Sequence, residues 1–232
     1  MSAVRSATYY GAGFPYNPID SLPGRLIVLE GPDGVGRSSQ ITALRQWLEE
    51  QGYGVSDTGL ARSELTAPGL DAAKAGHTIS TLCMSLFYAT DFADRLENQI
   101  IPALRAGFIV LSDRYFYSTL ARDIVRGVDP QWAQSVYGFA LKPDAVFYLR
   151  ASVDTLVSRM VHGRGLNYWE SGMDMNLADN LYDSFTLYQS RMQEQFETLA
   201  SQYGFTVIDA DQEFAAVQET LRQQILPIIQ SM

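Results

Sequence analysis

An apolar run of strand length that passes through a glycine-rich turn into a helix is the feature that most constrains this chain. The segment is LIVLEGPDGVGRSSQ, residues 26–40. Its Gly31, Gly36 and Ser38 occupy the glycine and hydroxyl positions of the phosphate-binding pattern G-x-x-x-x-G-K-[ST], and Arg37 stands at the lysine position. Such a loop turns its backbone N–H groups around a polyphosphate, at the positive end of the following helix. The segment therefore predicts a nucleotide site in which Arg37 places a planar cation, in place of an ammonium, beside the β- and γ-phosphates.

The composition favours one soluble domain. With 232 residues, 47% of them hydrophobic, the chain can bury one substantial core. No apolar run approaches the roughly 20 residues that cross a bilayer. The first residues lack the apolar stretch of a secretory signal, and the single Cys83 excludes an internal disulfide, so we expect a cytoplasmic protein. The net charge of −9 argues against binding of nucleic acid or of membranes, but not against a small nucleotide in a cleft lined by arginines.

Apolar runs and helical spacing alternate along the chain. Runs typical of strands cover residues 25–30, 108–112, 145–149 and 206–208, and a further strand is expected after the turn at 52–56. Helical spacing covers residues 40–51, 78–104, 131–140, 152–160, 176–202 and 213–229. Continuous apolar strands separated by helices predict an α/β fold, with a parallel sheet that is covered on both faces. Residues 1–24 show neither periodicity, and we interpret them as an N-terminal arm, either solvated or docked, that precedes a domain over residues 25–232.

A second motif, Asp113-Arg114-Tyr115, follows the apolar run at 108–112, about 75 residues after the glycine-rich loop. In parallel sheets ligands bind beyond the carboxyl ends of the strands, so this motif and the loop are expected to meet there. A carboxylate at that place can hold Mg²⁺ directly or through water. The guanidinium of Arg114 can clamp a phosphate with two parallel hydrogen bonds.

The loop, the segment ATDFADRLENQIIPALRAGFIVLSDRY at 89–115, Arg159 and the segment VIDAD at 207–211 together resemble the thymidylate kinase family of P-loop nucleoside monophosphate kinases. The resemblance extends from about residue 25 to residue 229. It implies a three-layer P-loop fold with a small lid at about 160–176. It also implies ATP-dependent phosphorylation of a nucleoside monophosphate, with dTMP as the leading acceptor, Mg²⁺ as cofactor and a homodimeric assembly.

The resemblance also implies roles for single residues. The residues expected to hold the phosphates of ATP are Gly31, Asp33, Gly34, Val35, Gly36, Arg37, Ser38 and Ser39. Ser38 and Asp113 would hold the metal. Asp33 would also lie near the acceptor sugar, Arg114 would bind the acceptor phosphate, Tyr88 would stack on its base, and Ser118 is assigned to the same pocket. Arg159 and Arg164 bracket the lid, where arginines neutralise charge on the moving phosphoryl group.

Several acceptor positions depart from the family pattern. Phe92 stands where the family has its base-reading arginine, and Arg95, one helical turn later, is a candidate replacement. Arg122 stands where relatives place an aromatic residue against the deoxyribose. Such changes alter substrate choice readily. Three interpretations therefore stay open: a dTMP kinase, a P-loop kinase with a different nucleotide or small-molecule acceptor, and a non-catalytic protein whose Arg37 holds ATP without transfer.

Overall fold

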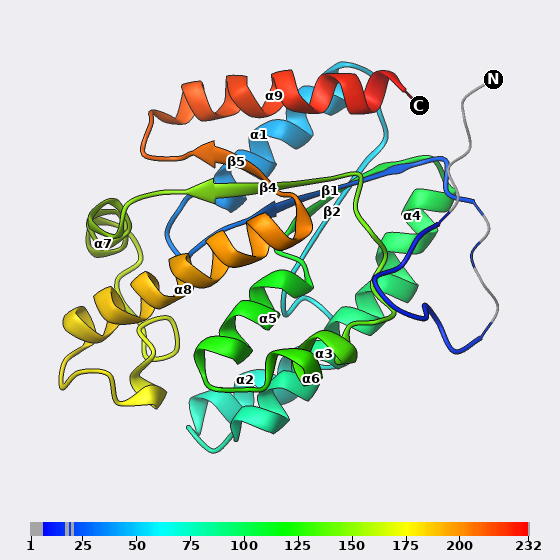
Figure 1. Ribbon diagram of the computed structural model, residues 1–232. Coiled ribbons are helices and arrows are strands. Elements are labelled where there is room, and N and C mark those ends of the chain that lie inside the picture. The colour runs from blue at the N-terminus through cyan, green and yellow to red at the C-terminus, as the bar shows by residue number, and fades with distance from the viewer. Residues whose placement is uncertain (1–6, 17–18, 20, 232) are drawn as a thin grey trace.

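A computed structural model, which describes residues 7–16, 19 and 21–231, places a parallel sheet between two layers of helices (Figure 1). The strands are β1 (Arg25–Glu30), β2 (Val55–Gly59), β3 (Ile109–Asp113), β4 (Ala145–Arg150) and β5 (Thr206–Asp209). The helices are α1 (Arg37–Glu50), α2 (Ala67–Ala75), α3 (Thr81–Arg95), α4 (Ile101–Arg105), α5 (Phe116–Val125), α6 (Pro130–Val136), α7 (Val153–His162), α8 (Leu181–Tyr203) and α9 (Phe214–Gln230). A π-helical turn, Leu96–Ile100, joins α3 to α4, and a 3-10 turn, Met173–Met175, precedes α8.

The strand order is β2-β3-β1-β4-β5, and each neighbouring pair is parallel. The central strand β1 pairs with β3 in a register that sets Leu29 opposite Asp113. The glycine-rich turn after β1 and the acidic residue at the end of β3 therefore leave the sheet at the same edge. This confirms the predicted α/β fold, and it brings the two motifs together.

Side chains of β1 alternate between the two faces of the sheet, as the pleat requires. Leu26 and Val28 pack in a core cluster with residues of α3, α4, α5 and α8. Ile27 and Leu29 pack in a second cluster with residues of α1, α7 and α9. Figure 1 shows α1 and α9 together on one side of the sheet and α3, α5 and α8 on the other. The continuous apolar pattern of β1 thus reflects burial on both faces.

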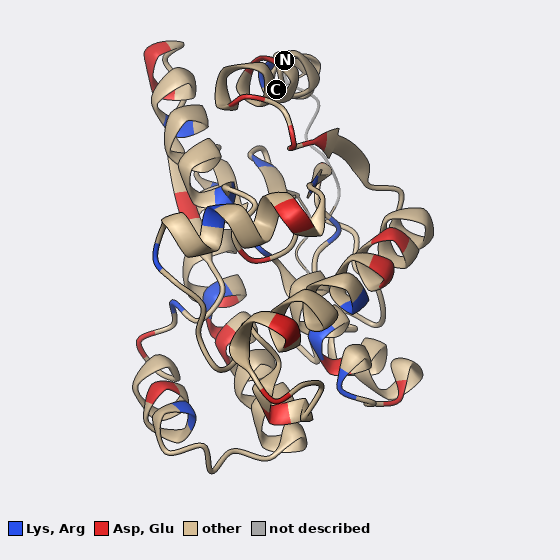
Figure 2. Ribbon diagram, turned by 90° about the vertical axis from the view of Figure 1, so that its left-hand side faces the viewer, with Lys and Arg blue, Asp and Glu red and all other residues tan. Residues whose placement is uncertain are grey.

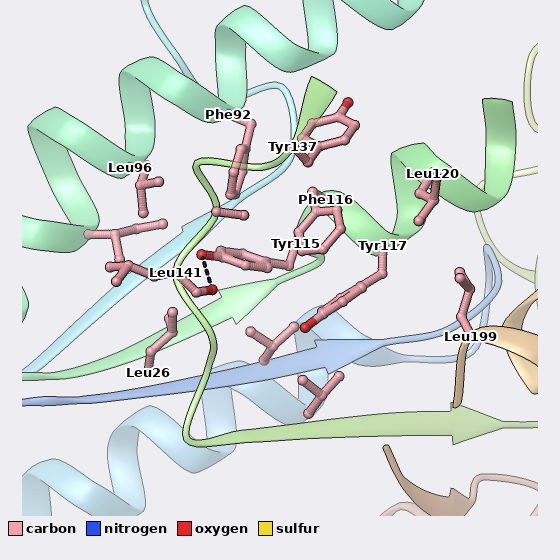
Figure 3. Packing of buried hydrophobic residues seen from close by; sticks show 14 of the residues in the cluster. Leu26, Phe92, Leu96, Tyr115, Phe116, Tyr117, Leu120, Tyr137, Leu141 and Leu199 are labelled. Atoms are coloured by element: carbon pink, nitrogen blue, oxygen red, sulfur yellow. Dashed lines mark hydrogen bonds between the residues drawn. The ribbon is translucent and has the colours of Figure 1, made fainter. Parts of the chain in front are cut away.

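Aromatic rings fill the core beneath the Asp113-Arg114-Tyr115 motif (Figure 3). The ring of Tyr115 meets that of Phe92 edge to face, with centroids 4.7 Å apart, and its hydroxyl donates to the carbonyl of Leu141 over 3.0 Å. Phe116 stacks on Tyr137 with centroids 5.2 Å apart. Edge-to-face and stacked arrangements are the preferred geometries of aromatic pairs, and each pair contributes about 0.5–1.5 kcal/mol beyond its burial. The residues that follow β3 are therefore anchored in this core.

The described part of the N-terminal arm is docked on this layer. The N–H of Tyr10 donates to the carbonyl of Ala140 over 3.1 Å, and that of Gly11 donates to the carbonyl of Gly138 over 2.9 Å. The Tyr10 ring packs against Phe116 and Tyr203, with centroids 5.3 and 5.2 Å apart. Of the two alternatives left open for the arm, these contacts correspond to the docked one. Residues 1–6, 17–18 and 20 of the arm lie outside the described part.

Several element boundaries differ from those expected. The helix expected at 176–202 begins at Leu181, because the Asn180 side chain accepts the N–H of Asp183 and caps it there. The helix expected at 131–140 ends at Val136, and the Gly138 carbonyl beyond it accepts hydrogen bonds from the arm. Helices α2 and α5 were not predicted. In the part of the chain that the structure describes, no helix combines the length and the apolar character that a membrane span needs.

Candidate active site

The turn after β1 has the backbone geometry of an anion-binding loop. Gly31, Gly34 and Gly36 have φ angles of 144°, 86° and 96°, which glycine adopts without steric cost. At Gly31 a Cβ atom would also lie 2.6 Å from the Leu149 carbonyl oxygen, so the neighbouring strand excludes a side chain there. Gly36 caps α1 without a side-chain hydrogen bond, and the first turn of α1 holds no acidic residue. The positive end of α1 is therefore available to a phosphate.

Arg37 braces this loop from within. Its Nε donates to Asp113 Oδ1 over 2.9 Å, and its Nη1 donates to the carbonyls of Gly31 and Pro32 over 2.6 and 2.5 Å. Its Nη2 makes no hydrogen bond to the described part of the chain. The sequence predicts this cation beside the phosphates of a bound nucleotide. The structure adds that two of its three nitrogens hold the loop to β3. A lysine ammonium at this position has no fork with which to make these separate contacts.

Ser38 and Asp113 form a compact polar pair at the start of α1. The Ser38 hydroxyl donates to Asp113 Oδ2 over 2.5 Å. Burial raises the pKa of Asp113, but the Arg37 charge, the Ser38 hydrogen bond and Arg114 outweigh it and hold that pKa below its ordinary value. An ionised carboxylate beside a hydroxyl fits Mg²⁺, which keeps several waters and shares phosphate oxygens. The described residues contain no cluster of three or more His, Cys, Asp or Glu.

A buried carboxylate between two arginines lies next to this pair. Asp33 Oδ1 accepts from Arg114 Nη2 over 2.5 Å, and Arg122 Nη2 lies 3.3 Å from Asp33 Oδ2. Burial raises the pKa of Asp33, yet the charges of Arg114 and Arg122 reverse that effect and hold the pKa well below its ordinary value. Burial, followed by the Arg37 charge, lowers the pKa of Arg114 to about 10. Arg114, Asp33 and Arg122 thus form a charged row, and its two guanidinium groups can bind a phosphate dianion.

A network of hydrogen bonds continues from the other side of the Arg114 guanidinium to Ser118 and Glu30. Arg114 Nη1 donates to the Gly31 carbonyl over 3.0 Å and to Ser118 Oγ over 2.6 Å, and that hydroxyl donates to Glu30 Oε2 over 2.5 Å. The backbone of Arg114 has a φ of 72°, which is strained for a residue with a side chain. Its N–H donates to the Leu29 carbonyl over 3.0 Å and holds that conformation. Strain of this kind gathers at functional sites, where surrounding contacts enforce it.

A cavity of 610 Å³ runs from the glycine-rich loop to α2, α3 and α5. Its size and its mixture of charged and apolar walls are those of a ligand site. Its walls include residues at the carboxyl ends of β1, β2 and β3, which lie on the side that faces the viewer in Figure 2, where basic and acidic segments are interspersed. The sequence-predicted residues that line it are Asp33, Gly34, Gly36, Arg37, Ser38, Ser39, Tyr88, Asp113, Arg114, Arg122, Arg159 and Arg164.

Three predicted acceptor residues do not line the cavity. Phe92 is fully buried in the aromatic core, and Arg95 is fully buried with its Nε on Asp91 at 2.9 Å. Asp91 in turn accepts the N–H groups of Ala61 and Ser63, so the Asp91–Arg95 pair fixes the loop after β2. Ser118 lies behind Arg114. The expectation that Phe92 and Arg95 contact the acceptor base therefore does not match the geometry, because packing of α3 turns both side chains inward.

The segment between α7 and α8 covers one side of the cavity through Arg164, Asn167, Trp169 and Glu170. Trp169 Nε1 donates to the carbonyl of Lys74 on α2 over 3.2 Å. Arg126 donates to Asp174 Oδ2 over 2.7 Å and to the Tyr188 hydroxyl over 2.7 Å, and so ties this segment to α5 and α8.

Sequence reasoning missed Lys74, Arg126 and Trp169. Arg126 lies four residues after Arg122 on one helix, a spacing that indicates a shared face. Lys74 lies on a helix that the sequence did not reveal, and no signal pointed to it.

Comparison with known proteins agrees with this geometry. The sequence matches the family model described as thymidylate kinase over residues 29–221. It is 37% identical over 204 residues to a probable thymidylate kinase 2 of Saccharolobus solfataricus, an alignment that covers 87% of this chain and 95% of the relative. It is 32% identical over 220 residues to a probable thymidylate kinase of Thermococcus kodakarensis (89% and 97% covered) and 31% identical over 224 residues to a thymidylate kinase of Synechococcus sp. (90% and 100% covered). With its P-loop, its Asp113-Arg114-Tyr115 motif and a match that spans most of its length, the chain belongs to the thymidylate kinase family.

Proposed function

We propose that this protein transfers the γ-phosphoryl group of ATP to the phosphate of dTMP, which yields ADP and dTDP. The observation that carries the proposal is the single cavity that joins the glycine-rich loop at one end to Tyr88 at the other, with Arg114 and Arg122 between them. A donor polyphosphate and an acceptor nucleotide then meet end to end in one site. Membership of the thymidylate kinase family supports the reaction. The lining of the cavity supports the proposed positions of the two nucleotides.

At the donor end, the loop from Gly34 to Ser39 and the N-terminus of α1 bind the ATP phosphates through backbone N–H groups. Mg²⁺ held by Ser38 and Asp113 would neutralise phosphate charge when bound. Arg37 keeps the loop in its binding shape through the two carbonyls it contacts, and its remaining nitrogen is available to a phosphate oxygen. The ionised state of Asp113 at neutral pH follows from the direction of its pKa shift.

At the acceptor end, Arg114 and Arg122 attract the dTMP phosphate and hold it in line with the donor. The attacking oxygen of a phosphate is already anionic, so the site needs no strong general base. Catalysis then rests on positioning and on electrostatic stabilisation of the phosphoryl group in flight. Arg159 and Arg164 approach the transferred group from α7 and the lid, as arginines do in other phosphoryl transferases. Tyr88 supplies the face against which the base stacks.

The test is formation of dTDP and ADP from Mg-ATP and dTMP, measured beside a panel of other nucleoside monophosphates. Arg37→Ala removes the cation and both loop braces, and we expect turnover to fall by about 10²–10³-fold, as it does when one transition-state donor is lost. Arg45→Ala is the matched control, because Arg45 lies on the same helix with its side chain 47% exposed and pairs only with surface carboxylates. Its turnover is expected to stay within about twofold of wild type. If ADP is released only with another nucleoside monophosphate, that nucleotide and not dTMP is the acceptor. If the protein binds ATP but turns over no acceptor, the proposed kinase activity is refuted.

The assembly and the arm belong to the same proposal. We propose a cytoplasmic homodimer in which residues 25–232 form the catalytic domain, residues 160–176 its lid and residues 1–24 an arm that stabilises the helical layer. The contacts of Tyr10 and Gly11 with the segment after α6 support the role given to the arm. Removal of residues 1–24 should lower the melting temperature by several degrees, while light scattering reports whether the mass of the dimer changes. An unchanged melting temperature would contradict the role of the arm.

A further inference from the structure

Lys74 is a cation of the cavity that the proposed mechanism does not use. It lies near the end of α2 and lines the same cavity as Tyr88. Its Nζ lies 2.6 Å from the Tyr88 hydroxyl, to which it donates, and 5.2 Å from the centroid of the Tyr88 ring. Its own carbonyl accepts from Trp169 Nε1 in the lid. The ammonium group is thus held at the rim of the surface on which an acceptor base would stack.

Among the described residues that line the cavity, Lys74 is the one cation that neither pairs with a carboxylate nor donates to a backbone carbonyl. Each arginine that lines the cavity donates to a carboxylate or to a backbone carbonyl. Among the described residues, Lys74 donates only to the Tyr88 hydroxyl. An ammonium has three donors and no acceptor, so two N–H groups remain for a ligand. A ligand atom that accepts hydrogen bonds would pair with the free N–H groups of the ammonium. A ligand group that donates would be disfavoured, because two donors would then face each other.

The two α3 positions that the sequence pattern indicated for base recognition do not contribute side chains to the cavity near Tyr88. Phe92, which replaces the expected base-reading arginine, is fully buried, and the candidate replacement Arg95 is fully buried on Asp91. Neither reaches the cavity. Helix α2 packs beside α3 and lies below α5 in Figure 1, on the side away from the sheet. A base stacked on Tyr88 with its phosphate at Arg114 would direct the edge remote from the sugar toward α2.

We propose that Lys74 reads that remote edge and selects a pyrimidine with a carbonyl oxygen there, as in thymine, over one with an amino group, as in cytosine. This inference rests on the proposed function, because it takes the acceptor to be a nucleoside monophosphate bound at Tyr88. It assigns base selection to α2, outside α3 where the sequence pattern located it. The contact between Trp169 and the Lys74 carbonyl links the same helix to the lid.

The test compares dTMP with dCMP in the wild type, Lys74→Met and Lys74→Arg. Lys74→Met keeps an unbranched apolar stem and removes every donor, so KM for dTMP should rise about tenfold to a hundredfold, the effect of one lost hydrogen bond to a charged group. The value of kcat for dTMP and KM for ATP should stay within about twofold, because the lost contact exists equally in the ground state. The preference for dTMP over dCMP, as the ratio of kcat/KM values, should fall by the same factor as KM rises. Lys74→Arg should retain most of that preference.

A role of Lys74 limited to holding the Tyr88 ring gives a different result. Equal rises of KM for dTMP and dCMP in Lys74→Met, or an unchanged ratio, would overturn the inference. A wild type that makes no dTDP would refute the proposed kinase separately. Calorimetric affinities of dTMP and dCMP would then decide the role of Lys74, since equal affinity ratios in wild type and Lys74→Met refute it.

Discussion

The substitution Asp33→Asn tests the charged row at the centre of the cavity. The carboxylate of Asp33 lies between Arg114 and Arg122, with hydrogen bonds of 2.5 Å to the first and 3.3 Å to the second, and the residue is 5% exposed. Asparagine has the same shape but no charge, and its amide nitrogen would face a guanidinium. Arg114 would then depend for compensation on Glu30, with which it shares Ser118.

The expected loss of stability is large because the arginines stay buried. Removal of one partner from a buried ion pair costs about 3–5 kcal/mol, since the remaining charge is left without compensation. For a chain of this size, 1 kcal/mol corresponds to a shift in melting temperature of about 2–4 °C, so a fall of roughly 6–20 °C follows. Phosphate or ATP should restore more stability to the variant than to the wild type, because the bound anion replaces the lost carboxylate.

Asp57→Asn is the matched control. Asp57 also lies between two arginines, Arg45 at 2.5 Å and Arg62 at 3.2 Å, but its side chain is 30% exposed. Solvent-screened pairs of this kind contribute about 0.2–1 kcal/mol each. Urea denaturation at neutral pH, with and without phosphate, measures both variants. Equal free energies of unfolding for Asp33→Asn and Asp57→Asn, or a phosphate response no larger than that of the wild type, would refute the reasoning.

Three further predictions follow from single residues. Arg37→Lys keeps the charge but loses the fork, so turnover should lie between those of the wild type and Arg37→Ala in steady-state assays; turnover equal to the wild type would show that the loop braces are dispensable. Burial raises the pKa of Asp123 from 3.8 to about 6, and the folded state therefore binds this proton more tightly than the unfolded state. The free energy of unfolding should accordingly fall by on the order of 2 kcal/mol as pH rises from about 4 to about 6, a trend that urea titrations should find reduced in Asp123→Asn. Gly172→Ala places a methyl group 2.7 Å from the Tyr188 ring at a φ of 63°, and calorimetry should show a loss of about 1–3 kcal/mol, whereas an unchanged melting temperature would mean that the lid relaxes freely.

Much of the fold follows from local patterns in the sequence. The apolar run of β1 and the glycines after it define a strand, a turn and a helix within 26 residues of chain, Arg25 to Glu50. Strand β3 is equally plain, and its last residue is the Asp113 that the motif identified. These elements were predictable because each is fixed by its own residues: β-strand burial by continuous hydrophobicity, and the loop by glycines at positive φ. Helix α2 was not, since its nine residues include Pro68 and Gly69 and only Leu70 is buried.

The sequence by itself determined the glycine-rich loop at one end of the cavity, because such a loop is a local structure whose residues are neighbours in the chain. Only the tertiary structure decided the other end, near Tyr88. The direction in which Phe92 and Arg95 point depends on the packing of α3 against the aromatic core, and the partners of Arg122 and Lys74 lie on other elements. The contacts of Lys74 with Tyr88 and of Arg122 with Asp33 join residues 14 and 89 positions apart, and spacing along the chain carries no record of them.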